Sequence, residues 1–540
     1  MIHFDNNPTL YWLCGYLLTG IVILCAISKK VPLAGFIVAC MLLLVGMRMP
    51  VVVFNRELNA DESQMLSHAI TLNQDPIYWQ SADGTTIGPL DNYLLVIPKL
   101  LGFQIDYTSG RAMGLLCTAA AILFLFFSLR QIFGEQTARI SILFPLFLLA
   151  FTQEVDFVHY SSEQLPVLLL SACLWLLTQL FHSDKNRSTI GFSLALLAGM
   201  IPFAKLQAVP MAIVLVSCAL WVTFTKFKRN RQIKPILAIM AGGITFPLLV
   251  LIWTIYYDVF DDLIDFYILG NVIYAGGNEA PAIPVQFFKI FNLSADFKAF
   301  TFALLIPMLA GLWYLITTRK SCAIKSHTII ISAIALLILS SIYAVTKSGN
   351  DFIHYLNFCI IPWTLLAAWG IQKWGIKSIV FPVFLILWFF IGDALSYKKH
   401  HLLNSFASDN ARSLAQSPVV SELKKYTKEK DFMAVWGWQC SYYVEAQLAE
   451  ATAENHSERS IFKHAMQDKY KSRYLSDIQR TTPAIFLDAV GKNSLWVQDR
   501  KTQGFENFPE LADFINRNYT YQGLFDDTRL YVRNDRIKTP

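Results

Sequence analysis

Residues 32–62 read PLAGFIVACMLLLVGMRMPVVVFNRELNADE, an apolar run that ends in the acidic pair Asp61 and Glu62. The run over residues 32–54 is long enough to cross about 30 Å of hydrocarbon as a helix. The whole chain of 540 residues agrees, since 54% of it is hydrophobic, only 16% is charged and the mean hydropathy is +0.42. Soluble globular chains carry about 25% charged residues. The sequence therefore predicts a polytopic membrane protein and excludes a disordered chain, a collagen or a disulfide-stapled secreted module.

About twelve apolar runs long enough to span a bilayer occur before residue 395. They lie near residues 10–28, 32–54, 109–130, 137–153, 164–182, 189–204, 207–225, 235–256, 298–318, 328–345, 355–371 and 377–394. The sixth and seventh runs are close together, and either could be half-buried or re-entrant. The first run has neither a basic segment before it nor a small-residue cleavage site, so we expect a retained helix rather than a signal peptide. The sequence thus predicts an all-α polytopic domain over residues 1–394.

Basic residues fall in alternate loops between these runs. The loops contain Lys29–Lys30, His182 to Arg187, Lys226 to Arg231 and Arg319–Lys320. By the positive-inside rule this side is the cytoplasm, and an even number of helices places both chain ends outside. Of the acids before residue 395, only Glu135 and Asp184 fall in cytoplasmic loops, which favours outward-facing chemistry. The net charge of +6 is too small and too dispersed to indicate a nucleic-acid partner.

Residues 395–540 have a different composition and contain no run long enough to span. Helical patterns occur near residues 409–428 and 460–480, and strand patterns at 431–436 and 483–487. A hairpin over residues 519–533 should turn near Asp526–Asp527. Cys440 is the one cysteine in this segment, so it cannot form a disulfide within it. The sequence predicts one small α/β domain outside the membrane.

Three outer loops could carry chemistry, at residues 55–108, 154–163 and 257–297. In the first, Asp61 could cap an interfacial amphipathic helix, and a favourable first-turn charge is the simplest interpretation of the pair Asp61–Glu62. The alternative is a carboxylate held at the membrane surface as a general base.

The second outer loop contains Asp156, His159 and Glu163, which would share a face if the segment were helical. Asp156 and His159 are candidate ligands of a divalent metal ion, although no Cys or His pair supports a closed zinc site. The alternative is that solvated polar residues end a helix here.

Two later residues could bind an anion. Lys205 interrupts an apolar stretch and could either snorkel to the interface or hold a lipid phosphate. His354 precedes a spanning helix, where free N–H groups suit an anion, although a polar cap is the alternative.

Six short motifs follow one another in a definite order. They are Ala60–Asp61–Glu62–Ser63, Ile87 to Leu94, Tyr160–Ser161–Ser162–Glu163, Pro202 to Gln207, His354–Tyr355 with Pro362, and Val435 to Trp438 with Arg459. In this order the chain resembles the membrane glycosyltransferases of the GT-C fold. The most similar group is the bacterial branch of the protein-mannosyltransferase and aminoarabinose-transferase-like family (glycosyltransferase family 39-like). The chain departs from that family in having two helices, rather than one, before the acidic pair.

The resemblance implies transfer of a monosaccharide from a polyprenyl-phosphate donor to a lipid, glycan or protein acceptor. The reaction would take place at the outer face of the inner (plasma) membrane, with the C-terminal domain in the periplasm. It would invert the anomeric carbon, with Asp61 as general base and Glu62 supporting it or binding a cation. The residues implied in binding the donor and its phosphate are Arg111, Tyr160, Glu163, Lys205, Gln207, His354 and Tyr355. The sugar and the need for a metal ion stay open.

Three other functions compete with this one. A secondary transporter would need charges near the bilayer midplane and a repeat that relates its halves, and neither occurs in the sequence. A polymerase or ligase of lipid-linked glycans has similar chemistry but moves an oligosaccharide from a diphosphate lipid. A catalytically inactive scaffold is the third alternative.

Overall fold

The structure is a computed structural model that describes residues 8–28, 30–182, 187–276, 282–317, 324–401, 403, 406 and 412–537. The chain divides into two compact units, each treated separately below. The helical unit comprises Met1–Phe54, Gly114–Ile252 and Ala275–Asp409. The α/β unit comprises Asn55–Met113, Trp253–Tyr274 and Asn410–Pro540.

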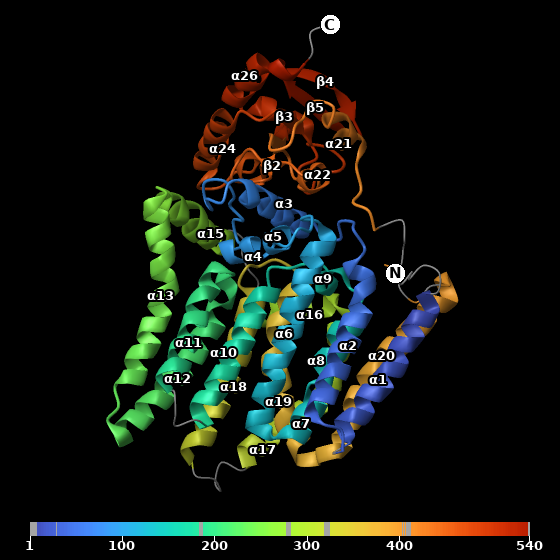
Figure 1. Cartoon of the computed structure of the whole chain (residues 1–540), viewed down its shortest axis with the longest axis vertical. Coiled ribbons are helices and arrows are strands. Elements are labelled where there is room, and N and C mark those ends of the chain that lie inside the picture. The colour runs from blue at the N-terminus through green and yellow to red at the C-terminus, as the bar shows by residue number, and fades with distance from the viewer. Residues whose placement is uncertain are drawn as a thin grey trace. The chain divides into compact units, whose positions relative to one another are not determined.

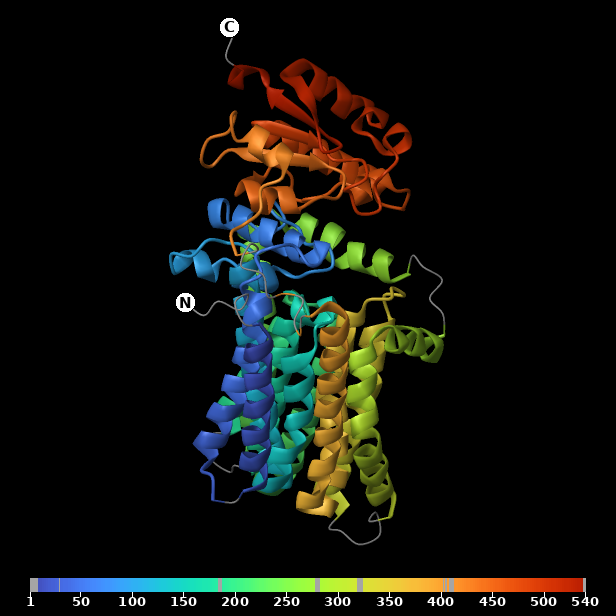
Figure 2. The ribbon, with the colours of Figure 1, turned by 90° about the vertical axis from the view of Figure 1, so that its right-hand side faces the viewer.

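The long helices of the helical unit run side by side (Figures 1 and 2). Long and short helices make up this unit. They are α1 (Pro8–Ile27), α2 (Leu33–Val52), α6 (Tyr107–Phe133), α7 (Glu135–Ser141), α8 (Leu143–Phe151), α9 (Val155–Val158), α10 (Gln164–His182), α11 (Arg187–Met200), α12 (Val209–Asn230), α13 (Lys234–Tyr256), α16 (Ile283–Leu293), α17 (Ala295–Thr317), α18 (Ile324–Thr346), α19 (Asn357–Trp374) and α20 (Val380–His400). Helix α6 begins, and α13 ends, in residues assigned to the α/β unit.

In the described residues each expected apolar run is helical over most of its length, and the protein is a multi-pass membrane protein. Among the described residues, eight helices are long and apolar enough to cross a membrane, and one of these stretches, Ile353–His400, includes both α19 and α20. The fourth run is divided at Ile142 into α7 and α8. The loop residues Lys29, Asp184, Arg319 and Lys320, on which the expected orientation partly depends, lie outside the described residues.

Two glycines bring α17 and α19 into close contact. A Cβ atom at Gly370 would lie 2.1 Å from the carbonyl oxygen of Pro307, and one at Gly311 would lie 2.5 Å from that of Leu366. Helices in membranes pack most closely where small residues meet, because lipid supplies no hydrophobic drive for their association. The close α17–α19 contact therefore requires residues without a Cβ atom at these two positions.

Gly370→Ala is expected to destabilise the helical unit by about 1–3 kcal/mol, the usual cost of overpacking. The matched control is Gly392→Ala in α20, where an added Cβ meets no atom within 4 Å. Thermal unfolding in detergent should show a lower midpoint for Gly370→Ala alone. Equal midpoints for the two variants would contradict the close α17–α19 contact.

A five-stranded sheet in the order β2-β1-β3-β5-β4 organises the C-terminal part of the α/β unit. The strands are β1 (Phe432–Trp436), β2 (Ala449–Glu450), β3 (Ile485–Asp488), β4 (Tyr519–Phe525) and β5 (Thr528–Arg533). Strand β1 is parallel to β2 and β3, whereas β5 is antiparallel to β3 and β4. The β4–β5 turn has Asp526 and Asp527 at positive φ, as a two-residue hairpin loop requires. The expected strands and the hairpin are therefore present.

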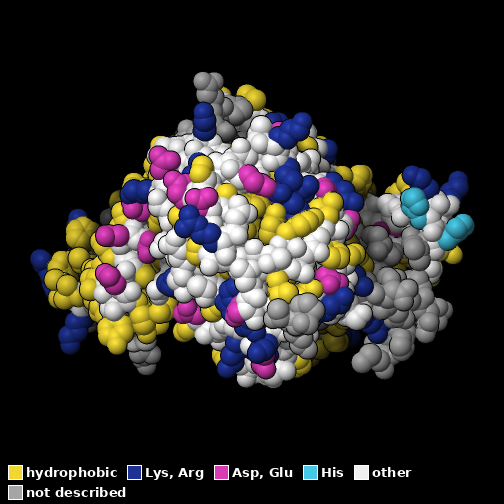
Figure 3. Space-filling view, turned by 90° about the horizontal axis from the view of Figure 1, so that it is seen from above, with side chains coloured by type: hydrophobic (Ala, Val, Ile, Leu, Met, Phe, Trp, Pro, Cys, Tyr) yellow, Lys and Arg dark blue, Asp and Glu magenta, His cyan; other side chains and the backbone are white. Residues whose placement is uncertain are grey.

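Helices and apolar side chains cover both faces of this sheet, because successive residues of β1 and β3 point to opposite sides. Met433 and Val435 belong to one buried cluster, and Ala434 and Trp436 to the other. Helices α21 (Pro418–Leu423) and α22 (Ser441–Ala446) contribute to the first cluster, and α24 (Gln467–Thr481) and α26 (Pro509–Asn518) to the second. The remaining helices of this part are α23 (Glu458–Ile461) and α25 (Arg500–Gln503). The helix expected over 409–428 is thus limited to α21 in the described residues. On the face seen in Figure 3, basic and acidic side chains are interspersed.

The first outer loop supplies α3 (Ala60–Gln74), α4 (Pro89–Leu94) and α5 (Ile97–Leu100), while Trp253–Tyr274 supplies α14 (Phe260–Asp262) and the start of α15 (Gly270–Gly276). Every residue of α3 from Glu62 to Leu72 is buried. The expectation of an interfacial amphipathic helix is therefore wrong. The polar face of α3 packs against the C-terminal segment, where His68 contacts Glu450 at 2.8 Å and Asn455 donates to Ser67 at 2.7 Å.

Candidate active site

The acidic pair lies in the first turn of α3, where Asn59, rather than Asp61, caps the helix. The Asn59 side chain accepts a hydrogen bond from the backbone N–H of Asp61 at 3.0 Å. The expected capping role of Asp61 is thus filled by a residue two positions earlier. Asn59 also fixes the backbone from which the two carboxylates extend.

Glu62 is fully buried and is held by Arg111 from α6. The guanidinium donates from Nε to one carboxylate oxygen at 2.8 Å and from a terminal nitrogen to the other at 2.6 Å. Arg111 is also buried, and it donates to the carbonyl of Arg56 as well. Such bidentate charge-assisted pairs are strong and fix orientation. The cation that Glu62 binds in this structure is therefore the Arg111 side chain. The sequence analysis expected Arg111 to contact the donor phosphate, whereas here it pairs with Glu62.

Asp61 has the opposite environment. Its side chain is half-buried and accepts no hydrogen bond from the described residues. The two adjacent carboxylates therefore differ, since Glu62 is held in an ion pair by Arg111, whereas no described residue donates a hydrogen bond to Asp61. A general base needs such an uncommitted carboxylate on a rigid mount.

A second group of expected site residues lies in the helical unit, around Lys205. This lysine lies in the break between α11 and α12 and is 4% exposed. Its ammonium donates to the carboxylate of Glu163 and to the hydroxyl of Ser162, and lies 5.0 Å from the ring centroid of Tyr355. Glu163 is fully buried. Lys205 therefore does not snorkel; it forms a buried ion pair.

His354 connects this pair to Asp156. Its Nδ1 lies 2.9 Å from an Asp156 oxygen, and its Nε2 lies 3.9 Å from a Glu163 oxygen. Burial raises the pKa of the Glu163 carboxyl, but Lys205 and His354 outweigh burial and hold that pKa below its usual range. The pKa of Asp156 is likewise raised by burial and lowered more strongly by the hydrogen bond and charge of His354. Both carboxylates are therefore ionised at neutral pH.

The shared helical face expected for Asp156, His159 and Glu163 is wrong, because α9 ends at Val158 and α10 begins only at Gln164. His159 instead places Nδ1 2.8 Å from the carbonyl of Val155. Asp156 and Glu163 still meet, through His354, which lies 198 residues beyond Asp156.

No group of three or more His, Cys, Asp or Glu side chains able to hold a metal ion occurs within the described ranges. Asp156 pairs with His354. The His159 ring, whose Nδ1 lies beside the Val155 carbonyl, also meets the His354 ring edge to face at 5.6 Å. No step below is assigned to a metal ion.

The other residues expected in this site are Tyr160, Tyr355 and Gln207. Tyr160 is fully buried and Tyr355 is 4% exposed. The side chain of Gln207 contacts the carbonyl of Ala344 at 3.5 Å, within the packing of α18.

Arg48 is a residue that the sequence analysis did not single out. It donates to the carbonyls of Phe157 and Val158, at 3.1 and 3.0 Å, and so holds α9 in place. A single arginine within the apolar run over 32–54 was the signal that could have identified it, because a buried charge in such a run needs a partner.

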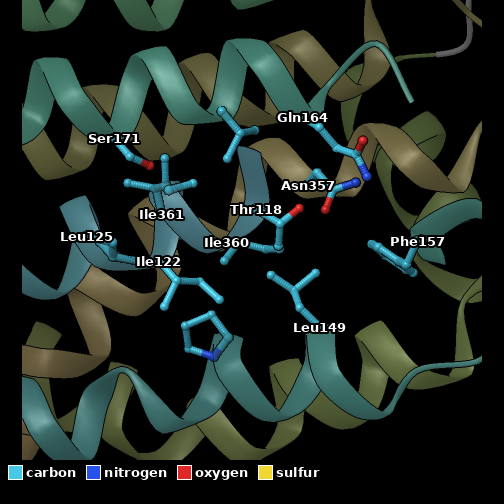
Figure 4. Close-up of a pocket in the computed structure, with 13 residues that line it drawn as sticks. Thr118, Ile122, Leu125, Leu149, Phe157, Gln164, Ser171, Asn357, Ile360 and Ile361 are labelled. Carbon is cyan, nitrogen blue, oxygen red and sulfur yellow. The ribbon is translucent and has the colours of Figure 1, made fainter. Parts of the chain in front are cut away.

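A small cavity of about 30 Å³ lies among α6, α8, α10 and α19 (Figure 4). The amides of Gln164 and Asn357 lie toward one end, and side chains such as Ile122, Leu149 and Ile360 line the rest. Asn357 donates to the carbonyl of His354 at 2.9 Å, so the polar end adjoins the Lys205 group. The volume suits a water molecule or two and is too small for a prenyl chain.

Comparison with known proteins identifies the fold. No family model and no curated protein matches the sequence. The crystal structure of ArnT from Cupriavidus metallidurans bound to undecaprenyl phosphate matches with a TM-score of 0.56 at 11% identity, over 94% of this chain and 99% of that chain. ArnT is an aminoarabinose transferase of the GT-C fold. The chain therefore has the GT-C fold, with a polytopic helical domain and a C-terminal α/β domain, and the fold class expected from the sequence is confirmed.

Two further solved structures are more distant. ArnT in the apo state has a TM-score of 0.44 at 11% identity, over 92% of this chain and 98% of that chain. The Archaeoglobus fulgidus oligosaccharyltransferase in the apo form has a TM-score of 0.42 at 11% identity, over 94% of this chain and 75% of that chain. At these scores neither adds to the identification of the fold.

Proposed function

We propose that the protein is a membrane glycosyltransferase that moves a monosaccharide from a polyprenyl-phosphate donor to a lipid, glycan or protein acceptor. The reaction is inverting, and Asp61 is its general base. The protein acts at the outer face of the inner membrane, with its C-terminal domain in the periplasm. The GT-C fold shared with ArnT, whose crystal structure contains undecaprenyl phosphate, supports this class of enzyme.

The observation that carries the proposal is the difference between the two neighbouring carboxylates. Glu62 is buried and bound by Arg111 through two charge-assisted hydrogen bonds. Asp61, one residue earlier, is half-buried and accepts no hydrogen bond from any described residue. A purely structural acidic pair has no need for one member to stay uncommitted, whereas a base must have a free lone pair for its proton.

In the proposed reaction, Asp61 takes the proton of an acceptor hydroxyl. The acceptor oxygen attacks the anomeric carbon from the face opposite the phosphate, and the carbon–oxygen bond to phosphate breaks. The bonding electrons leave with the polyprenyl phosphate. Stabilising the charge that develops on this leaving group is the second requirement of the reaction.

Lys205 is the residue that we propose for this second role. An ammonium has three N–H donors, and in the structure two acceptors, the carboxylate of Glu163 and the hydroxyl of Ser162, are within bonding reach. One donor is then left for a phosphate oxygen. Glu163, Tyr355 and His354 hold the lysine in place, and Gln207 and Tyr160 belong to the same proposed donor site.

The direct test uses the full chain, purified and placed in lipid nanodiscs, with a panel of polyprenyl-phosphate monosaccharides. We expect one donor to be consumed with release of polyprenyl phosphate. Consumption of a diphosphate-linked oligosaccharide instead would indicate a polymerase or ligase. No consumption, together with solute uptake in vesicles, would indicate a transporter.

A further inference from the structure

A cleft of about 550 Å³ in the α/β unit adjoins the start of α3. Glu57, Leu58, Asn59 and Ala60 line one side, immediately before Asp61. The loops after β1 and β3 line the other, through Trp438 to Cys440 and residues 493–496 with Gln498. The volume lies within the range of small-ligand sites, about 300–1,000 Å³.

Two tryptophans form an aromatic corner in this cleft. The rings of Trp438 and Trp496 meet edge to face, with centroids 5.1 Å apart and an interplanar angle of 79°. Trp438 in turn stacks on the imidazole of His456 at 4.0 Å and 6°. Burial, assisted by the positive charge of Arg459, lowers the pKa of His456 to about 3, so this ring is neutral. The position of the Trp438 ring is thus fixed by its stacking on the neutral His456 ring.

Trp496 is placed differently, because it is 55% exposed and has a φ of +60°. Bulky side chains rarely adopt this backbone conformation, and where they do the surroundings impose it. Here the loop is tied to the β1 loop, since Trp438 N–H donates to Ser494 at 2.7 Å and Leu495 N–H donates to the Trp438 carbonyl at 3.0 Å. The fold therefore holds a large apolar ring in solvent at the edge of the cleft, at a cost in both backbone strain and exposed apolar area.

The polar groups around this corner are mainly amides. Asn59, Gln439, Asn493 and Gln498 supply them, and Glu57 adds a carboxylate. An amide offers two donors and two acceptors, and among the described residues the side chains of Asn59, Gln439 and Gln498 each make one hydrogen bond. Aromatic faces that cover the C–H surface of a pyranose, with amides and a carboxylate for its hydroxyls, are the chemistry that recognises a sugar.

We infer that this cleft binds a sugar residue of the acceptor, so that the acceptor is a carbohydrate or carries one. The inference rests on the proposed function, because it assigns to the cleft the substrate whose hydroxyl Asp61 deprotonates. It excludes a plain protein segment or an unglycosylated lipid as the group recognised here. Trp496 is the specificity-determining contact, and Asn59 joins the cleft to Asp61 directly, since it both lines the cleft and caps the helix.

The experiment measures binding separately from catalysis. Neutral and amino-sugar oligosaccharides of two to six residues are titrated into the full chain in nanodiscs, with saturation-transfer NMR and tryptophan fluorescence as readouts. We expect at least one oligosaccharide to bind, Trp496→Ala to weaken its affinity at least about tenfold, and Trp496→Phe to restore part of it. Tyr521→Ala, which removes a ring that is 50% exposed in the same unit, should leave the affinity unchanged.

Each outcome separates this inference from the proposed function. Asp61→Asn should still bind the oligosaccharide, so a failure of transfer alone leaves the cleft assignment standing. No oligosaccharide binding by the wild-type chain, or equal binding by Trp496→Ala, would overturn the inference. Sugar transfer to an acceptor without carbohydrate would also overturn it, while the glycosyltransferase proposal would stand.

Discussion

Replacing Asp61 by asparagine is expected to lower the rate of sugar transfer by about 10²–10⁴-fold, the usual contribution of a general base. Asparagine has the same shape but cannot accept the proton of the acceptor hydroxyl at neutral pH. The Asp61 side chain is half-buried and accepts no hydrogen bond from the described residues, so little packing or pairing is lost. The variant should therefore keep the unfolding midpoint of the wild-type chain, and only donor consumption with acceptor present should fall.

The control for this variant is Asp75→Asn, at the other end of α3. Asp75 is also half-buried, and its backbone N–H, rather than its side chain, caps the helix. The same chemical change there should leave transfer unaffected. Glu62→Gln gives a second contrast, because it leaves the buried guanidinium of Arg111 without its charged partner and should lower stability first. Wild-type transfer rates in Asp61→Asn would remove Asp61 from the catalytic role.

The helices and the sheet of this protein could largely be predicted from local sequence. Each apolar run is long enough to satisfy its own backbone in a bilayer as a helix, so the positions of helices such as α2 and α6 follow from composition. The β4–β5 hairpin likewise follows from alternating residues around Asp526 and Asp527. These features need no knowledge of the rest of the chain.

The environment of α3 could not be predicted in this way. Its apolar positions alone suggest a helix on a membrane surface, and its polar positions suggest solvent. Both faces are buried because Glu450 and Asn455, almost four hundred residues later, bind His68 and Ser67. A local pattern shows where polar groups lie along a helix, but it does not show which residues form hydrogen bonds with them.

The candidate site shows the same limit. Its members could be identified as charged residues next to apolar runs, but their pairing could not. Glu62 with Arg111 and Lys205 with Glu163 each join residues more than forty positions apart. These pairings show which carboxylates are held by a cation in the described residues, so the proposed assignment of roles depends on them.

Lys205→Met is expected to destabilise the helical unit by about 3–5 kcal/mol, because it leaves the buried Glu163 carboxylate without its partner. The pKa of Glu163 lies below its usual range, so at neutral pH the carboxylate is charged and the loss is that of a true ion pair. Unfolding in detergent measures the effect. The matched control is Lys289→Met, which breaks a pair with Asp351 in which the lysine is 57% exposed, and should cost at most about 1 kcal/mol.

The double variant Lys205→Met/Glu163→Gln separates the structural role of the lysine from its proposed role toward phosphate. Removing both charges takes away the unpaired carboxylate, so most of the lost stability should return. If Lys205 also binds the donor phosphate, this restored protein still lacks that cation, and its KM for a polyprenyl-phosphate sugar should rise. A stable double variant with the wild-type KM would confine Lys205 to the ion pair. If Lys205→Met alone were as stable as Lys289→Met, that result would contradict the buried pair itself. Among the described residues Lys205 is the only lysine that pairs with Glu163, so its removal should cost stability.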